Sequence, residues 1–438
     1  MDSDQFDYVA PKAKEELFQG AVKNIDVNQV NNINKPPEIT TANTTNSNNV
    51  PISTNPVSNA HDYVLNLLKV MLSLNASDMF ITEGFPPAVK LNGAMKPLSN
   101  NPLTAQHTEE FTKAVMNDKQ WNEFTTKSEC NFAIAPAGIG RFRVNAFRQQ
   151  GRAGMVLRTI NTTIPNIDDL GVPDILKSII SEKRGLVIVV GATGSGKSTT
   201  LAAMLGHRNA TQAGHIITIE DPIEFVHPHN KSLFTQREVG VDTENWEAAL
   251  KNTLRQAPDV ILIGEIRDRE TMEYAVAFAE TGHLCLATLH ANNSNQALDR
   301  IINFFPEERR HQLLMDLSLN LKSIVSQRLI PSKDKGRVPA VEVLLNTPFI
   351  SDLIFKGEVA QIKEAMKQGR ELGMQTFDQA LFDLYEHELI TFEDALRNAD
   401  SSNDLRLNIK LQSKRALPDS MTSGSIGLKI RNDKEGMH

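Results

Sequence analysis

The stretch GLVIVVGATGSGKSTTLAAML, residues 185–205, decides the fold of this chain. Its first residues form an unbroken apolar run, which is typical of a strand in a parallel sheet that is buried on both faces. Residues 197–209 have the pattern of a helix, and residues 191–199 match G-x-x-x-x-G-K-[ST]. A glycine-rich loop that joins a buried strand to a helix predicts a phosphate-binding loop in an α/β domain.

The chemistry of this loop follows from its residue types. The glycines allow the backbone N–H groups to face phosphates, and the helix N-terminus adds partial positive charge. Lys197 is placed to reach the β- and γ-phosphates of ATP, and the Ser198 hydroxyl is placed to bind Mg²⁺. A glycine-rich turn without a ligand is the weaker alternative, because the glycines, the lysine and the serine all fit at once. We therefore assign the nucleotide site to Gly191, Ala192, Thr193, Gly194, Ser195, Gly196, Lys197, Ser198 and Thr199.

Apolar runs and helical patterns alternate after this loop, which predicts right-handed crossovers and a parallel sheet. Two further strands expected in this sheet end in acidic residues. Glu265 ends the strand at 260–266, so we expect it to face the nucleotide crevice and to hold Mg²⁺ directly or through water; a glutamate at a sheet edge is the alternative. Glu224 follows another strand and is a candidate to polarise the attacking water. Asp221-Pro222 beside it is equally typical of a plain turn.

Two histidines bracket the last expected strand of this sheet, at 284–290. His290 ends the strand and can face the crevice, whereas His283 precedes it and faces the opposite rim. An extended strand of this length separates the two rings by about 20 Å, so they cannot share a metal ion. A single histidine at a strand end is more often structural, and that interpretation is favoured for each one taken alone. Residues 295 through 330 and residues 375–397 are expected to be helices.

Upstream, residues 61–159 predict a small α+β domain. Helices are expected at 62–74 and 107–127, three strands before residue 160, and a hairpin at the Asn-Gly pair 92–93. In RFRVNAF, residues 141–147, the side chains alternate, so that Arg143 lies on the face opposite Phe142. Arg158 lies on the neighbouring strand. Such arginines form either a solvated face or an anion-binding face, and the sequence alone does not choose.

The rest of the chain is described by composition. Residues 1–60 are rich in Asn, Thr, Pro and Ser, which predicts a disordered extension; 160–170 is an expected linker and 412–438 an expected flexible tail. The net charge of −7 disfavours a nucleic-acid partner. The mean hydropathy is −0.30, and no apolar run reaches the roughly 18 residues that a membrane helix needs. The N-terminus lacks the pattern of a signal peptide, and two cysteines fit a reduced, cytoplasmic compartment.

Together these motifs resemble the secretion-type hexameric ATPases of type IV pili, specifically the PilT/PilU family of retraction ATPases. GATGSGKST resembles the Walker A motif of that family, TIEDPIEF its Asp box, QAPDVILIGEIRDRET its Walker B motif, AETGHLCLATLHANN its His box and ELGMQTFDQAL its C-terminal signature. The likeness runs from about His61 to Leu411. Three segments look closest to the PilU branch, and FISDLIFKGE stands where PilT carries AIRNLIRE. Residues 1–60 depart from the family pattern.

The resemblance implies a PAS-like N-terminal domain and a RecA-like ATPase domain at 171–411, assembled as a homo-hexamer with nucleotide between neighbours. By motif, Glu224 is similar to the catalytic glutamate, Glu265 to the Walker B carboxylate, and His283 and His290 to the His-box pair. Arg143 and Arg158 resemble the pair of arginines that reach a neighbour's nucleotide.

The implied activity is an ATP-driven motor of pilus retraction and twitching motility. The implied partners are a PilT-like ATPase and the platform protein at the inner-membrane pilus base, where the motor is cytoplasmic and peripheral. Pilus-extension and type II secretion ATPases are an alternative, but they usually carry a four-cysteine zinc module that two cysteines cannot form. A structural ring partner of PilT with weak turnover of its own is the other alternative.

Overall fold

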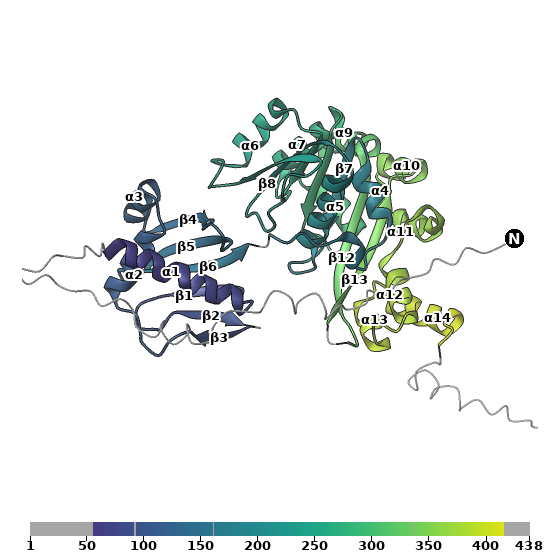
Figure 1. Cartoon of the computed structure of the whole chain (residues 1–438). Helices are drawn as coiled ribbons and strands as arrows, with labels where there is room; N and C mark the ends of the chain where they lie inside the picture. Colours follow the sequence, from purple (N-terminus) through teal and green to yellow (C-terminus); the bar gives the residue numbers. More distant parts are fainter. Residues whose placement is uncertain (1–55, 92, 161, 335, 416–438) are drawn as a thin grey trace, which may run out of the picture. The chain divides into compact units, whose positions relative to one another are not determined.

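A computed structural model of the chain describes residues 56–91, 93–160, 162–334 and 336–415 (Figure 1). The chain forms two compact units. The N-terminal unit extends to Ile164 and also contains Pro222–His227 and Glu238–Asn245; the C-terminal unit contains the rest from Pro165 onward. The boundary at 164–165 falls inside the expected linker. Most of the expected extension and most of the expected tail lie outside the described residues.

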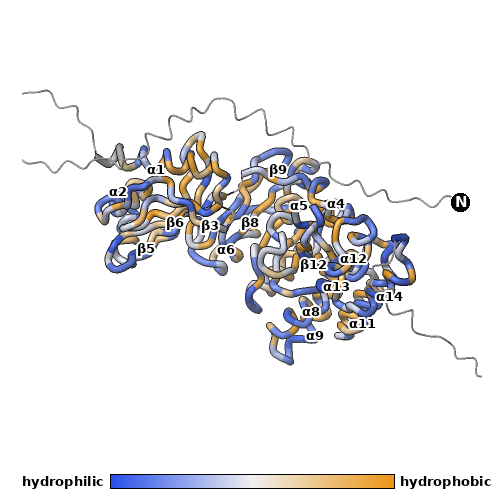
Figure 2. The backbone as a smooth tube through the Cα atoms, turned by 90° about the horizontal axis from the view of Figure 1, so that it is seen from below, coloured by the Kyte–Doolittle hydropathy of each residue, from blue (hydrophilic) through white to orange (hydrophobic). Residues whose placement is uncertain are grey.

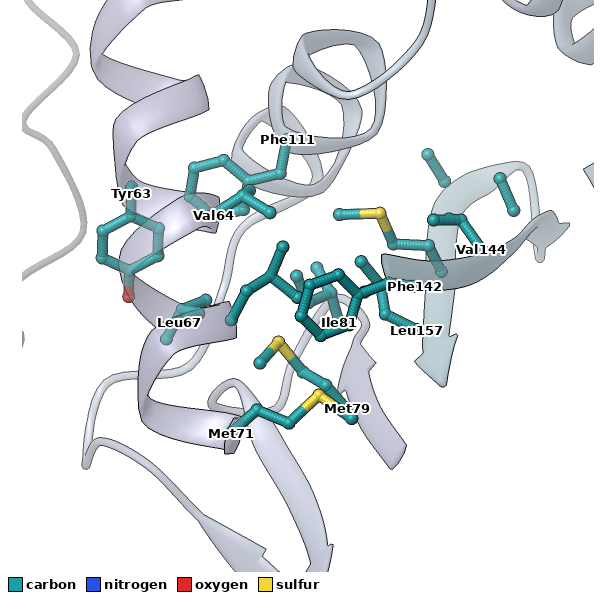
Figure 3. Packing of buried hydrophobic residues seen from close by; sticks show 14 of the residues in the cluster. Tyr63, Val64, Leu67, Met71, Met79, Ile81, Phe111, Phe142, Val144 and Leu157 are labelled. Atoms are coloured by element: carbon teal, nitrogen blue, oxygen red, sulfur yellow. The ribbon is translucent and has the colours of Figure 1, made fainter. Parts of the chain in front are cut away.

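The N-terminal unit is a six-stranded sheet with three helices. The antiparallel strands have the order β3-β2-β1-β6-β5-β4. Its elements are α1 (Pro56–Ser73), β1 (Asp78–Ile81), β2 (Ala88–Leu91), β3 (Ala94–Pro97), α2 (Ala105–Ala114), α3 (Asp118–Lys127), β4 (Glu129–Ile134), β5 (Arg141–Gln149) and β6 (Arg152–Ile160). Helix α1 packs its apolar face against the sheet, and Figure 3 shows Val64, Leu67 and Met71 pointing toward Met79 and Phe142. This core supports the outer sheet face that carries the arginines.

Two expectations for this unit need correction. The helix expected at 107–127 is interrupted, because the Asn117 side chain accepts a hydrogen bond from the Gln120 N–H and caps a new helix, α3. Helix α1 begins at Pro56 rather than near His61, and Ala60 is already buried. The expected hairpin is confirmed, since Leu91 pairs with Ala94 across its turn.

The C-terminal unit contains a seven-stranded sheet with the order β13-β12-β7-β11-β10-β8-β9. Strands β8, β10, β11, β7 and β12 are parallel, and β13 is antiparallel to β12. The strands are β7 (Gly185–Val190), β8 (Gly214–Glu220), β9 (Ser232–Glu238), β10 (Val260–Ile263), β11 (Leu284–Leu289), β12 (Leu321–Pro331) and β13 (Arg337–Leu345). Every residue of β7 is buried, as the unbroken apolar run predicts. The predicted α/β class with a parallel sheet is confirmed.

Helices flank this sheet and extend beyond β13. They are η3 (Ile167–Asp169), α4 (Ile175–Ser181), α5 (Lys197–Thr211), α6 (Trp246–Thr253), η4 (Leu254–Gln256), α7 (Arg269–Glu280), α8 (Ser294–Asn303), α9 (Glu307–Asn320), α10 (Pro348–Lys356), α11 (Val359–Gln368), η5 (Arg370–Leu372), α12 (Phe377–Glu386), α13 (Phe392–Asn398) and α14 (Ser402–Gln412). Figure 2 shows the hydrophobic segments gathered inside each unit. Among the described residues, no helix is long and apolar enough to span a membrane.

The helix expected at 323–330 is wrong, because these residues form β12. The strand lies beside β7 and is buried along most of its length, so its apolar residues do not alternate with polar ones. Its apolar residues come in two pairs, at 324–325 and 329–330, and so short a pattern does not distinguish a buried strand from a helix. Strands β9 and β13 were not expected from the sequence.

Candidate nucleotide-binding and catalytic site

The glycine loop at 191–196 leaves β7 and enters α5, as expected. Gly196 is the N-cap of α5 with φ +91°, a left-handed conformation that favours glycine. A Cβ at Gly191 would lie 2.4 Å from Ser195 Oγ and 2.6 Å from the Gln327 carbonyl oxygen. Thr200 Oγ1, one turn into α5, donates to Gln327 Oε1 at 2.7 Å. The loop is thus held against β12, and glycine is required at 191 because the backbones approach closely.

The loop fits a phosphate group. Lys197 Nζ donates to the carbonyl oxygens of Gly191 and Ala192 at 2.7 and 3.0 Å, which holds its charge over the loop. Ser195 Oγ is buried and has no hydrogen-bond partner among the described residues. A buried hydroxyl without a partner is costly, and a phosphate oxygen would satisfy it. The pocket at the loop has a volume of about 210 Å³ and is also lined by Arg328 and Arg337, which the sequence did not single out.

Glu265 contacts both His290 and Arg267, and Arg267 in turn reaches Asp221. Glu265 Oε2 accepts from Arg267 Nε at 2.7 Å, and Glu265 Oε1 lies 3.2 Å from His290 Nε2. Arg267 Nη1 also lies 3.5 Å from Asp221 Oδ2. The hydrogen bond that Arg267 donates to Glu265 is the main cause that raises the pKa of Arg267. The structure therefore brings the ends of β8, β10 and β11 into one charged network.

Arg267 was missed by the sequence analysis, although a signal for it exists. It lies two residues after Glu265, in the segment that follows β10, and this spacing favours one side of an extended chain. An arginine near an acidic residue usually indicates a solvated ion pair, so the pattern alone does not predict a functional residue. Its contact with the distant Asp221 appears only in the tertiary structure.

His290 and the glycine loop border the same pocket. This pocket has a volume of about 690 Å³ and is lined by Gly191, Ala192, His290 and residues of α8. Arg300 of α8 donates to the His290 carbonyl oxygen at 3.0 Å, which fixes the backbone after β11. The expectation that His290 faces the crevice agrees with this geometry; its part in catalysis stays a prediction.

His283 lies at the other end of β11, away from this pocket. Its Nδ1 atom is 3.1 Å from Thr281 Oγ1 and 3.2 Å from the Phe278 carbonyl oxygen. These contacts lie at the C-terminus of α7, so the position of the His283 ring is explained by local structure. The structure does not bring the two histidines together, and the catalytic assignment of His283 stays a prediction.

Glu224 lies on the segment Pro222–His227, which belongs to the N-terminal unit. The residue is exposed, and the neighbouring Ile223 N–H donates to Glu238 Oε2 at 3.2 Å. Burial lowers the pKa of His227 in the same segment to about 4. The proposed role of Glu224 in catalysis is not tested by this geometry.

Arg143 and Arg158 are directly paired across β5 and β6, so they share a sheet face as expected. Arg158 Nε donates to Asp78 Oδ1 at 2.7 Å, and its side chain is 70% exposed. Arg143 Nε lies 3.8 Å from Glu238 Oε1, and Glu238 is buried. Both arginines thus have a carboxylate nearby in their own chain, and their action on a neighbour's nucleotide stays a prediction.

A glycine loop between an interior strand of a mostly parallel sheet and the helix that follows it, beside a carboxylate and a histidine, defines a P-loop nucleotide hydrolase. The model of the family described as "Type II/IV secretion system protein" matches residues 127–370. The type IV pilus ATPase PilU of Pseudomonas aeruginosa is 59% identical over 84% of this chain and 97% of its own length. The type IV pilus retraction ATPase PilT of the same organism is 43% identical over 77% of this chain and 98% of its own length.

A solved structure supports the same assignment. The crystal structure of the pilus retraction motor PilT with bound ADP matches with a TM-score of 0.74 and 40% identity, over 78% of this chain and 99% of that chain. The chain belongs to the type II/IV secretion system family, among the type IV pilus ATPases of the PilT/PilU kind. It is an ATPase.

Proposed function

We propose that this protein is an ATP-hydrolysing motor of type IV pilus retraction and that it is the PilU-like accessory to a PilT-like ATPase. The observation that carries the proposal is the complete phosphate loop beside the Glu265–Arg267–His290 network, in a chain of PilT/PilU type. The identity of 59% to the PilU relative, against 43% to the PilT relative, supports the PilU-like branch.

In this proposal, residues 191–199 hold the phosphates of ATP, and Ser198 and Glu265 hold Mg²⁺. The metal ion would supply charge neutralisation between the phosphates. Lys197 carries the charge that Gly191 and Ala192 hold at the loop, and Arg267 orients the Glu265 carboxylate. Glu224 polarises the attacking water, and His290 links the crevice to the start of α8.

The proposed assembly is a homo-hexamer in the cytoplasm, at the inner-membrane base of the pilus. There it would act with the PilT-like ATPase on the platform protein. Arg143 and Arg158 would reach the nucleotide of a neighbouring subunit. The family relationship supports this assembly, because the resemblance implies nucleotide sites between neighbouring subunits.

The biochemical test is steady-state phosphate release by the full chain. Lys197→Ala should abolish turnover, because the charge on the phosphates is lost, while Lys410→Ala on the exposed face of α14 should leave it unchanged. Wild-type turnover in Lys197→Ala would contradict the site. A wild-type rate close to background would favour the structural ring partner over the motor.

The cellular test is a clean deletion, with and without the PilT-like ATPase present. A retraction accessory should reduce twitching and pilus retraction when it is deleted. Loss of pilus assembly instead of retraction would favour the pilus-extension alternative.

A further inference from the structure

Strand β12 places three consecutive polar side chains against three different parts of the C-terminal unit. Ser326 Oγ donates to Glu342 Oε1 at 3.0 Å, below the start of α8. Gln327 accepts from Thr200 beneath the glycine loop. Arg328, the next residue, contacts the C-terminal helices. None of the three belongs to a motif that the sequence indicated.

Arg328 makes four contacts with separate segments. Its Nη1 atom donates to the Asn398 carbonyl oxygen at 2.6 Å, and its Nη2 atom donates to Asp400 Oδ1 at 2.7 Å. Nη2 also donates to the Asn292 carbonyl oxygen at 3.2 Å, two residues after His290. The guanidinium group stacks on the Phe377 ring of α12, with 3.8 Å to the ring centroid. One side chain therefore joins the backbone that follows β11 to α12 and to the end of α13.

Asp400 is the anchor of this arrangement on the C-terminal side. Its side chain is 10% exposed, and Oδ2 also accepts from Lys363 Nζ of α11 at 2.9 Å. Burial acts to raise the pKa of Asp400, but the hydrogen bonds from Lys363 and Arg328 outweigh it and lower the pKa. The carboxylate is thus held as an anion between two cations, and removal of either partner would leave a charge that is largely buried.

Arg328 also lines the pocket of the glycine loop, together with residues 191–195. It borders a second pocket of about 550 Å³, which Lys363, Arg397 and Asp400 line. The same side chain therefore forms part of the wall of the nucleotide pocket and part of the wall that the C-terminal helices provide. A shift of the glycine loop and a shift of α13 would therefore both alter the contacts of Arg328.

We propose that Arg328 is a positioning residue that couples nucleotide binding at the glycine loop to the placement of helices α11–α14, through its contacts with Asp400 and Asn398. The proposal rests on nucleotide binding at this loop. Two sites that bias one shared element influence each other reciprocally, so the C-terminal helices also act on nucleotide affinity. A planar guanidinium is suited to this task, because it binds a carboxylate, carbonyl oxygens and an aromatic face at once, which lysine cannot do.

The test compares hydrogen exchange of the full chain with and without ADP. In the wild type, ADP should change the exchange rate of backbone amides in residues 391–412. Arg328→Gln and Asp400→Asn should each remove this difference, and Arg328→Lys should restore only part of it. The matched control is Arg370→Gln, which breaks an exposed ion pair with Asp383 of α12 and should keep the ADP-dependent difference.

Asp400→Asn separates coupling from direct contact, because Asp400 does not line the pocket of the glycine loop. ADP should still bind this variant, with an affinity changed by no more than a coupling factor of about 5 to 150. A purely structural contact would instead raise exchange equally with and without ADP. The variant's melting temperature shows whether it is folded, and Arg328→Lys supplies the comparison if it is not.

The proposal is overturned if the wild type shows no ADP-dependent exchange in residues 391–412 while it binds ADP. It is also overturned if folded Asp400→Asn, or Arg328→Lys in its place, keeps the full wild-type difference. Failure of the wild type to bind ADP is a different result, because it removes the nucleotide site and the proposed function together.

Discussion

Glu265 is positioned by its neighbours rather than by its own strand alone. One carboxylate oxygen binds Arg267 and the other faces His290, so the orientation of the group depends on residues from the ends of two strands. The pair is partly exposed, with 23% of Glu265 and 49% of Arg267 accessible, so its contribution to folding stability is small. Its importance lies in geometry, because a misplaced carboxylate lowers the rate of a reaction without unfolding the protein.

Arg267→Gln is therefore expected to reduce ATP turnover. Hydrogen bonds to charged groups contribute about 1.5–3 kcal/mol, which corresponds to a decrease in rate of about 10- to 150-fold if the whole contact serves the transition state. Steady-state kinetics should show the loss mainly in kcat. The control is Arg269→Gln, which breaks an exposed pair with Glu273 and should leave the rate unchanged. If Arg267→Gln and Arg269→Gln hydrolyse ATP at the same rate, Arg267 does not contribute to the site.

His227 predicts a pH dependence of stability. Burial lowers its pKa from 6.5 in the unfolded chain to about 4 in the folded chain. The buried site favours the neutral ring. The folded state therefore has its full stability above pH 6.5 and loses stability as the pH falls from 6.5 through about 4. The shift corresponds to about 3 kcal/mol.

The melting temperature should therefore fall more steeply between pH 6.5 and 4 in the wild type than in His227→Gln. At pH 8, where the ring is neutral in both states, the two proteins should differ only through packing. Parallel curves from pH 8 to pH 4 would contradict the buried neutral histidine.

At the scale of elements, β12 organises the candidate nucleotide site. It lies beside β7, contacts the glycine loop through Gln327 and reaches the C-terminal helices through Arg328. Its neighbour β13 supplies Glu342, a buried carboxylate that accepts from the Ser294 N–H and Oγ at the start of α8. Burial raises the pKa of Glu342. These two strands hold both the glycine loop and the helix that follows His290.

Ile324→Ala on β12 is expected to destabilise the C-terminal unit by about 2–5 kcal/mol, because the side chain is fully buried and its removal leaves a cavity. Urea unfolding followed by Trp246 fluorescence, in a Trp121→Phe background, reports on this unit, since each unit contains one tryptophan. Leu319→Ala, at a position that is 72% exposed, is the control and should change little. If Ile324→Ala loses no more stability than Leu319→Ala, the prediction that β12 is part of the core is wrong.

At the scale of the whole molecule, the ring is expected to complete each active site with arginines from a neighbour. Arg143→Ala and Lys197→Ala chains should each be inactive alone, since an arginine supplied to the γ-phosphate contributes about 10³–10⁵ in hydrolysis rate. Mixed rings contain interfaces with an intact loop and an intact Arg143, so partial activity should return on titration. Phosphate release under proven subunit exchange is the measurement.

The outcomes of this mixing experiment separate two arrangements. Normal hydrolysis by Arg143→Ala alone would show that the assignment of this arginine to the nucleotide site is wrong. An inactive Arg143→Ala chain that mixing does not restore would indicate action in cis or a ring that needs every site.

Truncation tests where the folded chain begins. A chain that starts at Pro56 keeps helix α1 and should retain the wild-type melting temperature and ring assembly, because the composition of residues 1–60 cannot form a core. A chain that starts after Ser73 loses the buried Leu67, Leu68 and Met71 and should unfold the N-terminal unit. A large loss of stability in the first truncation would contradict the predicted extension.

The parts of this protein that depend on local pattern could be predicted from the residues alone. The apolar run of β7, the glycine loop and the helix after it follow from residue types at fixed spacing. The strands expected to end at Glu265 and His290 are present as β10 and β11, which end at Ile263 and Leu289. The exposed and buried faces of β5 were also predictable, because side chains alternate along any strand.

Features that depend on distant neighbours could not be predicted, because they arise from the packing of separate elements. Residues 321–331 form a strand because β7 and β13 flank them, a condition that their mixed apolar and polar pattern does not reveal. Arg267 reaches Asp221, Gln327 supports the glycine loop, and Arg328 reaches Asp400, all across long stretches of chain. His283 and His290 look like a pair in sequence, yet an extended strand keeps them at opposite ends of the sheet. Local pattern fixes the backbone of single elements, whereas contacts between elements depend on how the chain brings them together.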